Sequence, residues 1–271
     1  MNANKALWEK GDFPRIAETM RASGEAVVAG LGITPALTVL DLGCGDGTTA
    51  IPAAGYAARV LGVDISESLV AAGVRRAQEH GLTNVTFQQG DASDLSELAD
   101  ETFDLVMSFF GAKFAPRPFD VAKEMDRVTR PGGRIVMGNW MIPGDPTLVA
   151  QLLKVSSAYS PPPPEGLVSP MTWGIEKNVI ERFGAAGVPD SNISFTKDTY
   201  TFELEASPSD FLADFKTYYG PTMNAYEVAE ANGRAAELQD ELEALFTSQN
   251  TSGTDQTTRI PATFLRVTVG R

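Results

Sequence analysis

The first half of the chain alternates short apolar runs with longer stretches in which apolar residues recur every three or four positions. Such alternation predicts β-strands separated by amphipathic helices. The apolar runs that read as strands are 37–43, 59–66, VTFQQGD, 103–111 and RIVMGNW. Strands connected through helices pair in parallel, and the crossover helices cover both faces of the sheet. The pattern therefore predicts an α/β fold with a mostly parallel sheet.

The same periodicities predict the elements on either side of this region. Residues 1–30 and 207–247 read as helical, the second stretch with an interruption at YYGPT. Further helices are predicted for PFDVAKEMDRVTRPGG, where Pro131 and the glycines stop the helix, for DPTLVAQLLKVSSAY and for GIEKNVIERFGAAG. Two more strands are predicted for ISFTKDTYTFELE and ATFLRVTVG. The proline run at 160–166 predicts a stiff extended connector.

The composition restricts the classes of function. The 271-residue chain is 43% hydrophobic, enough to bury a core, and its formal net charge is −13. A field of that sign repels phosphate backbones and anionic lipids, so we expect no nucleic-acid or membrane partner. One cysteine and one histidine allow no internal disulfide and no cysteine or multi-histidine metal cluster. Without a signal-peptide pattern or an apolar run of about 20 residues, the sequence predicts a cytoplasmic protein.

The segment TVLDLGCGDGTTAI carries the most specific pattern. Gly43, Gly45 and Gly47 follow the first predicted strand, where open α/β sheets bind ligands. Residues without β-carbons let a ligand approach the backbone, and the N-terminus of the next helix attracts an anionic group. A dinucleotide-binding loop reads G-x-G-x-x-G, whereas this loop reads G-x-G-x-G after Asp41. An acid at that place suits a ligand with an ammonium or other cationic group.

Two further acids end the next two predicted strands. Asp64 ends the second strand, where an acid accepts hydrogen bonds from ribose hydroxyls. Asp91 ends the third strand and is placed to accept a hydrogen bond from an exocyclic amine. The pattern therefore predicts a ligand that combines adenosine with an amino-acid end and a positive centre.

The motifs VLDLGCGDG, VLGVDIS, VTFQQGDA, FDLVMSFFG and RPGGRIV occur in the order found in class I methyltransferases that use S-adenosylmethionine. The chain resembles this class. The segments WEKGDFPRIA, FFGAKFAPRP, TWGIEKNVIERFG, TYYGPT and IPATFLRVTVG resemble a large bacterial group of small-molecule methyltransferases. The resemblance thus covers nearly the whole chain. It implies a Rossmann-like fold with a mostly parallel seven-stranded sheet, helices on both faces and a helical cap.

The resemblance also implies how the chain is organised. We expect a helical lid at 1–30, a cofactor-binding core at 31–140, and a C-terminal part at 141–271 with a substrate cap at about 207–250. Because both segments lie outside the core pattern, we expect the lid and the cap to close over the cofactor and to shape an acceptor pocket.

The resemblance implies roles for residues around the methionine part of the cofactor. Gly43, Gly45 and the backbone of Cys44 are expected to line this part, with Asp41 near its ammonium group. Ser108, after the fourth strand, is expected to face the same end.

The adenosine part is expected to contact other strand ends. By the same resemblance, Asp64 holds the ribose, Ile65 lies against the adenine, and Asp91 with the adjacent Ala92 takes the adenine amine. Trp8 falls in the N-terminal segment that covers the cofactor in such enzymes.

The sequence contains no obvious general base. The candidates are Lys113, Tyr218, Tyr219 and His80, although His80 also reads as a solvent-exposed helix cap. Related sequences often carry an apolar residue or a histidine at the position of Lys113, which tends to face the reaction site. Lys113 is therefore either a plain surface lysine or a residue that bears on the substrate, as a base or as a partner for an acidic acceptor.

The predicted activity is transfer of a methyl group from S-adenosylmethionine to a small molecule by in-line displacement, in biosynthetic or secondary metabolism, without a metal. We expect a monomer or homodimer, and S-adenosylhomocysteine as the product. The acceptor and the methylated atom (C, N or O) stay open. Two alternatives are an NAD-dependent oxidoreductase, which shares the sheet, and a non-catalytic protein that binds S-adenosylmethionine. The G-x-G-x-G spacing and Asp91 argue against the first, and the undamaged core motifs argue against the second.

Overall fold

The computed structural model describes residues 3–141, 144–159 and 168–271. The chain divides into two compact units, a sheet unit and a helical unit. The sheet unit comprises Gly24–Met141, Val168–Asp198 and Phe264–Arg271, and the helical unit comprises Met1–Ser23, Ile142–Leu167 and Thr199–Thr263. Two of the boundaries fall inside strands, so these strands contribute residues to both units.

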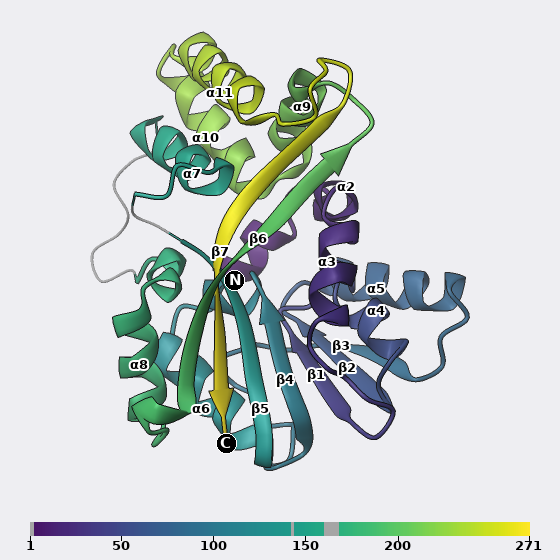
Figure 1. The fold of residues 1–271 in the computed structure, drawn as a ribbon. Helices are drawn as coiled ribbons and strands as arrows, with labels where there is room; N and C mark the ends of the chain where they lie inside the picture. The colour runs from purple at the N-terminus through teal and green to yellow at the C-terminus, as the bar shows by residue number, and fades with distance from the viewer. Residues whose placement is uncertain (1–2, 142–143, 160–167) are drawn as a thin grey trace. The chain divides into compact units, whose positions relative to one another are not determined.

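A seven-stranded sheet runs through the sheet unit in the order β3-β2-β1-β4-β5-β7-β6 (Figure 1). The strands are β1 (Thr38–Leu42), β2 (Arg59–Asp64), β3 (Val85–Gln89), β4 (Phe103–Phe109), β5 (Thr129–Trp140), β6 (Ile193–Leu204) and β7 (Thr258–Gly270). Strands β3, β2, β1, β4 and β5 pair in parallel, and β7 pairs with β5 antiparallel. The predicted mostly parallel, seven-stranded sheet is confirmed.

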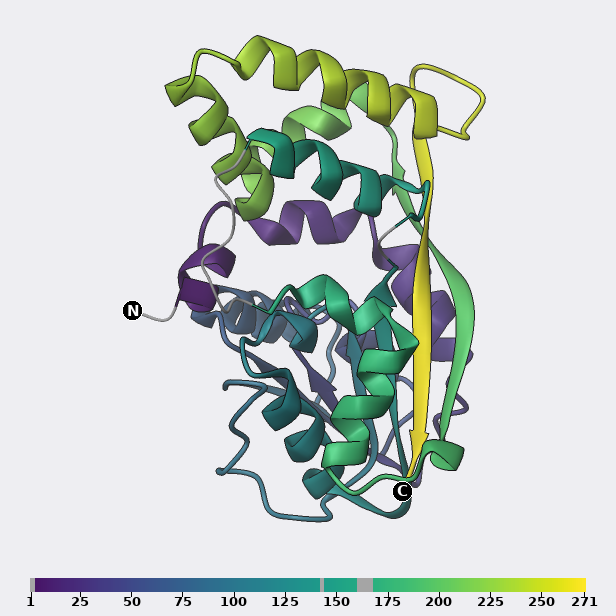
Figure 2. The same cartoon turned by 90° about the vertical axis from the view of Figure 1, so that its left-hand side faces the viewer.

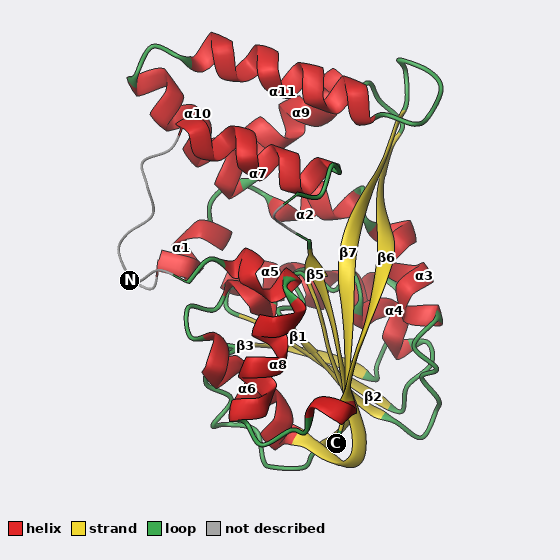
Figure 3. Ribbon diagram, turned by 60° about the vertical axis from the view of Figure 1, so that its left-hand side comes forward, coloured by secondary structure: helices red, strands yellow, loops and turns green. Residues whose placement is uncertain are grey.

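Helices cover both faces of this sheet. They are α3 (Arg21–Ala29), α4 (Ala50–Ala54), α5 (Glu67–Glu79), α6 (Pro118–Val128) and α8 (Glu176–Ala185), with the short 3₁₀ helices η1 (Ala112–Phe114), η2 (Pro170–Gly174) and η3 (Asp190–Asn192). Leu40 and Val106 of the central strands share a buried cluster with Val121 of α6 and Phe183 of α8. Figure 3 shows α3 and α4 on the opposite side of the sheet from α6 and α8.

The helical unit contains α1 (Ala3–Trp8), α2 (Phe13–Glu18), α7 (Leu148–Tyr159), α9 (Pro208–Tyr218), α10 (Gly220–Ala231) and α11 (Ala235–Gln249). Helices α7 and α11 lie side by side (Figure 2). The ring of Phe211 packs edge-on against Phe215 and Phe246, with centroids 5.0 and 5.4 Å apart. A capping box between Ser207 and Asp210 starts α9. The break between α9 and α10 falls at Tyr219, inside the predicted interruption.

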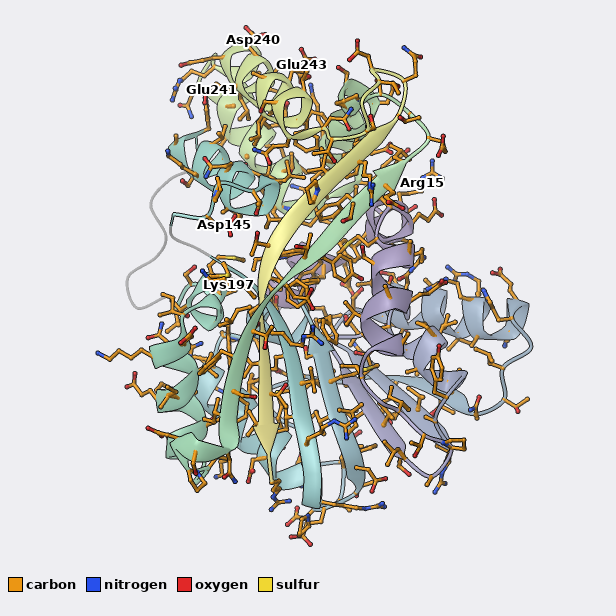
Figure 4. All side chains as sticks on the ribbon, in the orientation of Figure 1. Arg15, Asp145, Lys197, Asp240, Glu241 and Glu243 are labelled. Atoms are coloured by element: carbon orange, nitrogen blue, oxygen red, sulfur yellow. The ribbon has the colours of Figure 1, made fainter. Side chains whose placement is uncertain are left out.

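The acidic run ELQDELEALF lies on α11. Asp240, Glu241 and Glu243 are exposed along this helix (Figure 4). Glu241 also accepts a hydrogen bond of 2.7 Å from the hydroxyl of Tyr159, which ties α7 to α11. The acidic side chains of this run therefore lie on the solvent-facing side of α11.

Some expectations about element boundaries need correction or stay open. Helix α6 ends at Val128, because Thr129 already pairs with β4, and Pro131 lies inside β5 instead of stopping the helix. The predicted proline connector at 160–166 lies outside the described residues. Within the described residues, no helix is long and apolar enough to cross a membrane. The lid at 1–30 and the cap at about 207–250 remain predictions.

Candidate active site

The glycine loop after β1 is shaped by close packing inside the protein. Gly43, Gly45 and Gly47 have φ of 69°, 56° and 84°, a region that glycine adopts without strain. A β-carbon on Gly43 would lie 2.7 Å from the Cα of Gly111, and one on Gly47 would lie 2.9 Å from the ring of Phe87. The missing β-carbons of Gly43 and Gly47 therefore make room for neighbouring protein, and the approach of a ligand to this backbone stays a prediction.

The carboxylate of Asp64 holds this loop in place. One of its oxygens accepts a hydrogen bond from the backbone N–H of Gly45, and the other accepts one from the N–H of Ser66, both 2.9 Å long. Burial raises the pKa of Asp64, while the backbone hydrogen bonds from Ser66 and Gly45 oppose the rise. Asp64 thus links the end of β2 to the glycine loop, and its oxygens keep lone pairs for a further donor.

Asp41, at the penultimate position of β1, is buried with one oxygen unpaired. Its side chain is 0% exposed, and its Oδ2 accepts a 2.6 Å hydrogen bond from the hydroxyl of Thr49. Its Oδ1 has no hydrogen-bond partner among the described residues. Burial, reinforced by the nearby carboxylate of Asp64, raises the pKa of Asp41 to about 7. A buried acid with a free oxygen is suited to a cationic group, which would satisfy the oxygen and restore the charge.

The loop carries one more acid and the only cysteine. Asp46 is buried and faces Arg76 of α5, with 3.7 Å between Oδ1 and Nη1. Burial and the carboxylates of Asp64, Asp41 and Asp46 raise the pKa of the Cys44 thiol well above its ordinary value. A thiol of that kind stays protonated, which argues against Cys44 as a nucleophile.

The predicted adenosine residues lie at the carboxyl ends of β2 and β3, next to the loop. Ile65 follows β2 and is half-buried, and its carbonyl accepts a 3.0 Å hydrogen bond from the side chain of Gln89. Asp91 follows β3, and its Oδ1 accepts hydrogen bonds from the N–H and the hydroxyl of Ser93. Ala92 is buried. Because β1, β2 and β3 are adjacent and parallel, these strand ends and the glycine loop share one edge of the sheet.

The segment after β4 packs on the same loop. The buried hydroxyl of Ser108 accepts a 3.0 Å hydrogen bond from the N–H of Ala112, which fixes the start of η1. A β-carbon on Gly111 would lie 2.1 Å from the carbonyl oxygen of Gly43, so the two segments are in direct backbone contact. Lys113 follows on η1. It is 2% exposed, so the alternative of a surface lysine is wrong.

Sequence reasoning missed an aromatic stack at the ends of β4 and β5. Phe110 has a φ of 66°, which is strained for a residue with a β-carbon. Its ring lies parallel to that of Trp140, with centroids 3.6 Å apart, and Phe264 packs edge-on against both. The only signal in the sequence is the density of aromatic residues in FFGAKF and GNW.

The remaining predicted residues lie elsewhere. Trp8 and Tyr219 belong to the helical unit, where their rings pack edge-on with centroids 6.2 Å apart. Burial raises the pKa of Tyr219 to about 12, so its hydroxyl stays protonated at neutral pH. Tyr218 lies beside Arg15, whose guanidinium is 5.7 Å from its ring centre. His80 caps the C-terminus of α5 and is exposed, at the end of that helix far from the glycine loop.

Comparison with known proteins identifies the family. A sequence profile described as a methyltransferase domain matches residues 33–183. An uncharacterised protein of Mycobacterium tuberculosis is 32% identical over 241 residues, covering 88% of this chain and 85% of the relative. The structure of YcgJ from Bacillus subtilis is similar with a TM-score of 0.59 and 20% identity, over 92% of this chain and 98% of that one. The structure of a phosphoethanolamine N-methyltransferase of Haemonchus contortus, solved with phosphomonomethylethanolamine and S-adenosylhomocysteine, is also similar. Its TM-score is 0.54 at 17% identity, over 92% of this chain and 52% of that one.

The chain belongs to this methyltransferase family and is a class I enzyme that uses S-adenosylmethionine. The site described above fits this cofactor chemically. An ammonium group and a sulfonium suit an edge of the sheet at which Asp41, Asp46 and Asp64 are all buried. Among the described residues, the Oδ1 of Asp41 has no hydrogen-bond donor.

Proposed function

We propose that the protein methylates a small molecule in biosynthetic metabolism. The observation that carries the cofactor side of the proposal is the unpaired, fully buried oxygen of Asp41 beside the glycine loop. The net charge of −13 supports a small acceptor over a nucleic acid, because an enzyme acting on nucleic acid needs basic surface. The small phosphorylated amine bound to the Haemonchus contortus enzyme agrees with an acceptor of this size.

Different residues at this edge of the sheet would contact different parts of the cofactor. Asp41 would pair with the ammonium group, and the backbone of Gly43, Cys44 and Gly45 would line the methionine part. Asp64, already the partner of two backbone N–H groups, would add the ribose hydroxyls as donors.

The other residues assigned to the cofactor are Ile65, Asp91, Ala92, Ser108 and Trp8. Ile65 would cover the adenine, Asp91 with Ala92 would take its amine, and Ser108 would face the methionine end. The proposed contact of Trp8 with the cofactor rests on the resemblance alone.

The protein contributes mainly position and a dry surrounding. When bound, S-adenosylmethionine supplies a methyl group that its sulfonium already activates for displacement. The glycine loop and η1 are in backbone contact, and together they would form the side of the site that faces the acceptor. Holding the acceptor atom in line with the methyl group is worth several kcal/mol of barrier, on the order of 7–11 in well-oriented systems.

Two measurements test the proposal. Isothermal titration with S-adenosylhomocysteine should give micromolar binding, and NAD as the control ligand should give none. Binding of NAD alone would restore the oxidoreductase alternative.

The second measurement concerns the acceptor. Radiolabelled S-adenosylmethionine is incubated with the enzyme and either a small-molecule filtrate or the protein and nucleic-acid fraction of a bacterial extract. We expect label in products from the filtrate. Label only in the macromolecular fraction would overturn the small-molecule acceptor, and cofactor binding without label in either would favour the non-catalytic alternative.

A further inference from the structure

Lys113 is a buried amine, and no acidic side chain of the described residues forms an ion pair with it. Its Nζ lies 3.6 Å from the Sδ of Met171, 5.2 Å from the ring centre of Phe114 and 5.9 Å from that of Trp140. Sulfur is a weak acceptor, and ring faces are weaker partners for an ammonium group than a carboxylate. An ammonium group buried in this way lacks the counter-ion that a buried charge requires.

The ionisable groups on the surrounding elements face other partners. The 3₁₀ helix η2, with the sequence PMTWG, carries no ionisable side chain. On α6, which packs against η1, Asp120 pairs with Arg117, Glu124 pairs with Arg127, and Asp126 lies 3.6 Å from Arg271. At the glycine loop, Asp41 binds Thr49, Asp46 faces Arg76, and Asp64 binds backbone N–H groups. None of these described groups forms an ion pair with Lys113.

Burial without an acidic partner favours the neutral amine of Lys113 over its ammonium form. Burial alone holds the pKa of Lys113 well below its ordinary value. A neutral amine has a lone pair and accepts a proton, which an ammonium group cannot do. A buried lysine of this kind is useful where the substrate must lose a proton.

The position of this amine relates it to the cofactor loop. Lys113 lies on η1, and the residue that precedes η1, Gly111, is in backbone contact with Gly43. Ser108 fixes η1 from the end of β4. The amine is thus held by the segment that borders the proposed methionine end.

Aromatic side chains lie close to the amine. Phe114 and Trp140 present their rings to Nζ, and Trp140 is stacked on Phe110, whose backbone is strained. Strained residues of this kind cluster at functional sites. Rings packed edge-on and in parallel favour a further aromatic ring over an aliphatic chain.

Resting on the proposed methyltransferase function, we propose that the acceptor is a phenol and that the amine of Lys113 removes the proton from its hydroxyl group. The O–H bond of the phenol breaks, an N–H bond forms at Nζ, and a neutral pair becomes phenolate and ammonium. The ammonium group then provides the counter-ion that the phenolate needs. After the product leaves, the ammonium group returns its proton to water.

The test observes the phenolate directly, without turnover. The enzyme is saturated with S-adenosylhomocysteine and titrated with para-substituted phenols, from 4-nitrophenol to 4-methylphenol, each at a pH below its own pKa. The ultraviolet spectrum distinguishes bound phenolate from bound phenol. We expect phenolate on the wild-type enzyme, neutral phenol on Lys113→Met, and phenolate on the control Lys123→Met, whose lysine is exposed on α6.

A kinetic readout complements the spectra. With labelled S-adenosylmethionine, Lys113→Met should lose about 10²- to 10⁴-fold in kcat/KM on 4-methylphenol, the usual contribution of a general base. It should lose less than about tenfold on 4-nitrophenol, which ionises in water without help.

The outcomes separate the inference from the proposed function. If S-adenosylhomocysteine does not bind, both are overturned together. If S-adenosylhomocysteine binds but no phenol of the series binds the loaded enzyme, the proposal of a phenol acceptor is overturned and the cofactor assignment stands. If Lys113→Met also yields bound phenolate, or loses equally on both phenols, the role of Lys113 as a base is overturned. Methionine is apolar, so the substitution removes the buried amine without adding a polar group, and the fold tolerates it.

Discussion

The buried carboxylate of Asp41 lowers the stability of the cofactor-free protein. This cost is expected if its unpaired oxygen serves to bind the cofactor. The pKa of Asp41 rises from 3.8 to about 7 because the carboxylate is buried. At about 1.4 kcal/mol for each pKa unit, this rise corresponds to about 4 kcal/mol lost from the stability of the free enzyme above pH 7. The substitution Asp41→Asn removes the charge and keeps an oxygen for the hydrogen bond from Thr49. The amide of the new side chain would lack acceptors, which costs about 1–3 kcal/mol.

The expected net effect of Asp41→Asn is a more stable protein that binds cofactor poorly. We expect about 2 kcal/mol of added stability at pH 8, or a rise in Tm of about 4 °C, measured by scanning calorimetry without ligand. Loss of a charge-assisted hydrogen bond, about 1.5–3 kcal/mol, should weaken S-adenosylhomocysteine about 10- to 150-fold in isothermal titration. Asp120→Asn is the matched control, because Asp120 is half-exposed and pairs with Arg117 on the surface. It should change neither quantity appreciably.

The raised pKa of Asp41 determines the direction in which protein stability changes with pH. Between pH 3.8 and about 7 the native state keeps a proton on Asp41 that the unfolded chain releases, so this residue makes stability fall as pH rises. The gain from Asp41→Asn should therefore grow through that window and level off above it. Affinity for S-adenosylhomocysteine should rise with pH up to about 7 in the wild type, because only the carboxylate binds ammonium. A lower Tm together with unchanged affinity in Asp41→Asn would refute the reasoning.

Further predictions concern other parts of the two units. Lys113→Met should raise Tm at neutral pH, and the gain should shrink toward pH 10.5, where unfolded lysine also loses its proton; an unchanged Tm in calorimetry would mean that the amine is solvated. Gly111→Ala should cost about 1–3 kcal/mol and weaken S-adenosylhomocysteine binding, because its β-carbon would lie 2.1 Å from a backbone oxygen. The control Gly184→Ala, with nothing within 4 Å, should stabilise α8 by up to about 1 kcal/mol, both followed by urea unfolding. If the N-terminal segment is a lid, Trp8→Ala should weaken S-adenosylhomocysteine about tenfold, whereas the exposed aromatic control Phe119→Ala should not; equal affinities would argue against the lid.

Much of the sheet unit was predictable because its strands and helices differ in period. The acids Asp41, Asp64 and Asp91 could be placed together because parallel strands end at one edge of the sheet. Their surroundings were also partly predictable, since the glycine spacing excluded a pyrophosphate. These signals are local in the sequence, and each strand end can be read by itself.

The burial of Lys113 could not be predicted, because it depends on contacts between segments far apart in the sequence. Lys113 is covered by η2, whose Met171 lies 58 residues later in the chain. The left-handed backbone of Phe110 has the same origin, since its ring is held by Trp140 and Phe264 on two other strands. The close packing at Gly43 could not be predicted for the same reason, since a β-carbon there would meet Gly111, which lies in the segment after β4.

The three buried acids at and beside the glycine loop, Asp41, Asp46 and Asp64, also bear on how the product leaves. S-adenosylmethionine would bring an ammonium group, a sulfonium and a carboxylate to this edge of the sheet, whereas S-adenosylhomocysteine lacks the charge on sulfur. The carboxylates repel one another when the site holds too little positive charge. Methyl transfer would therefore remove part of the electrostatic attraction that retained the ligand, as soon as the ligand has given up its methyl group. Turnover would then be driven forward by electrostatics: the same loop that recruits the charged donor weakens its hold on the neutral thioether and favours exchange for a fresh donor.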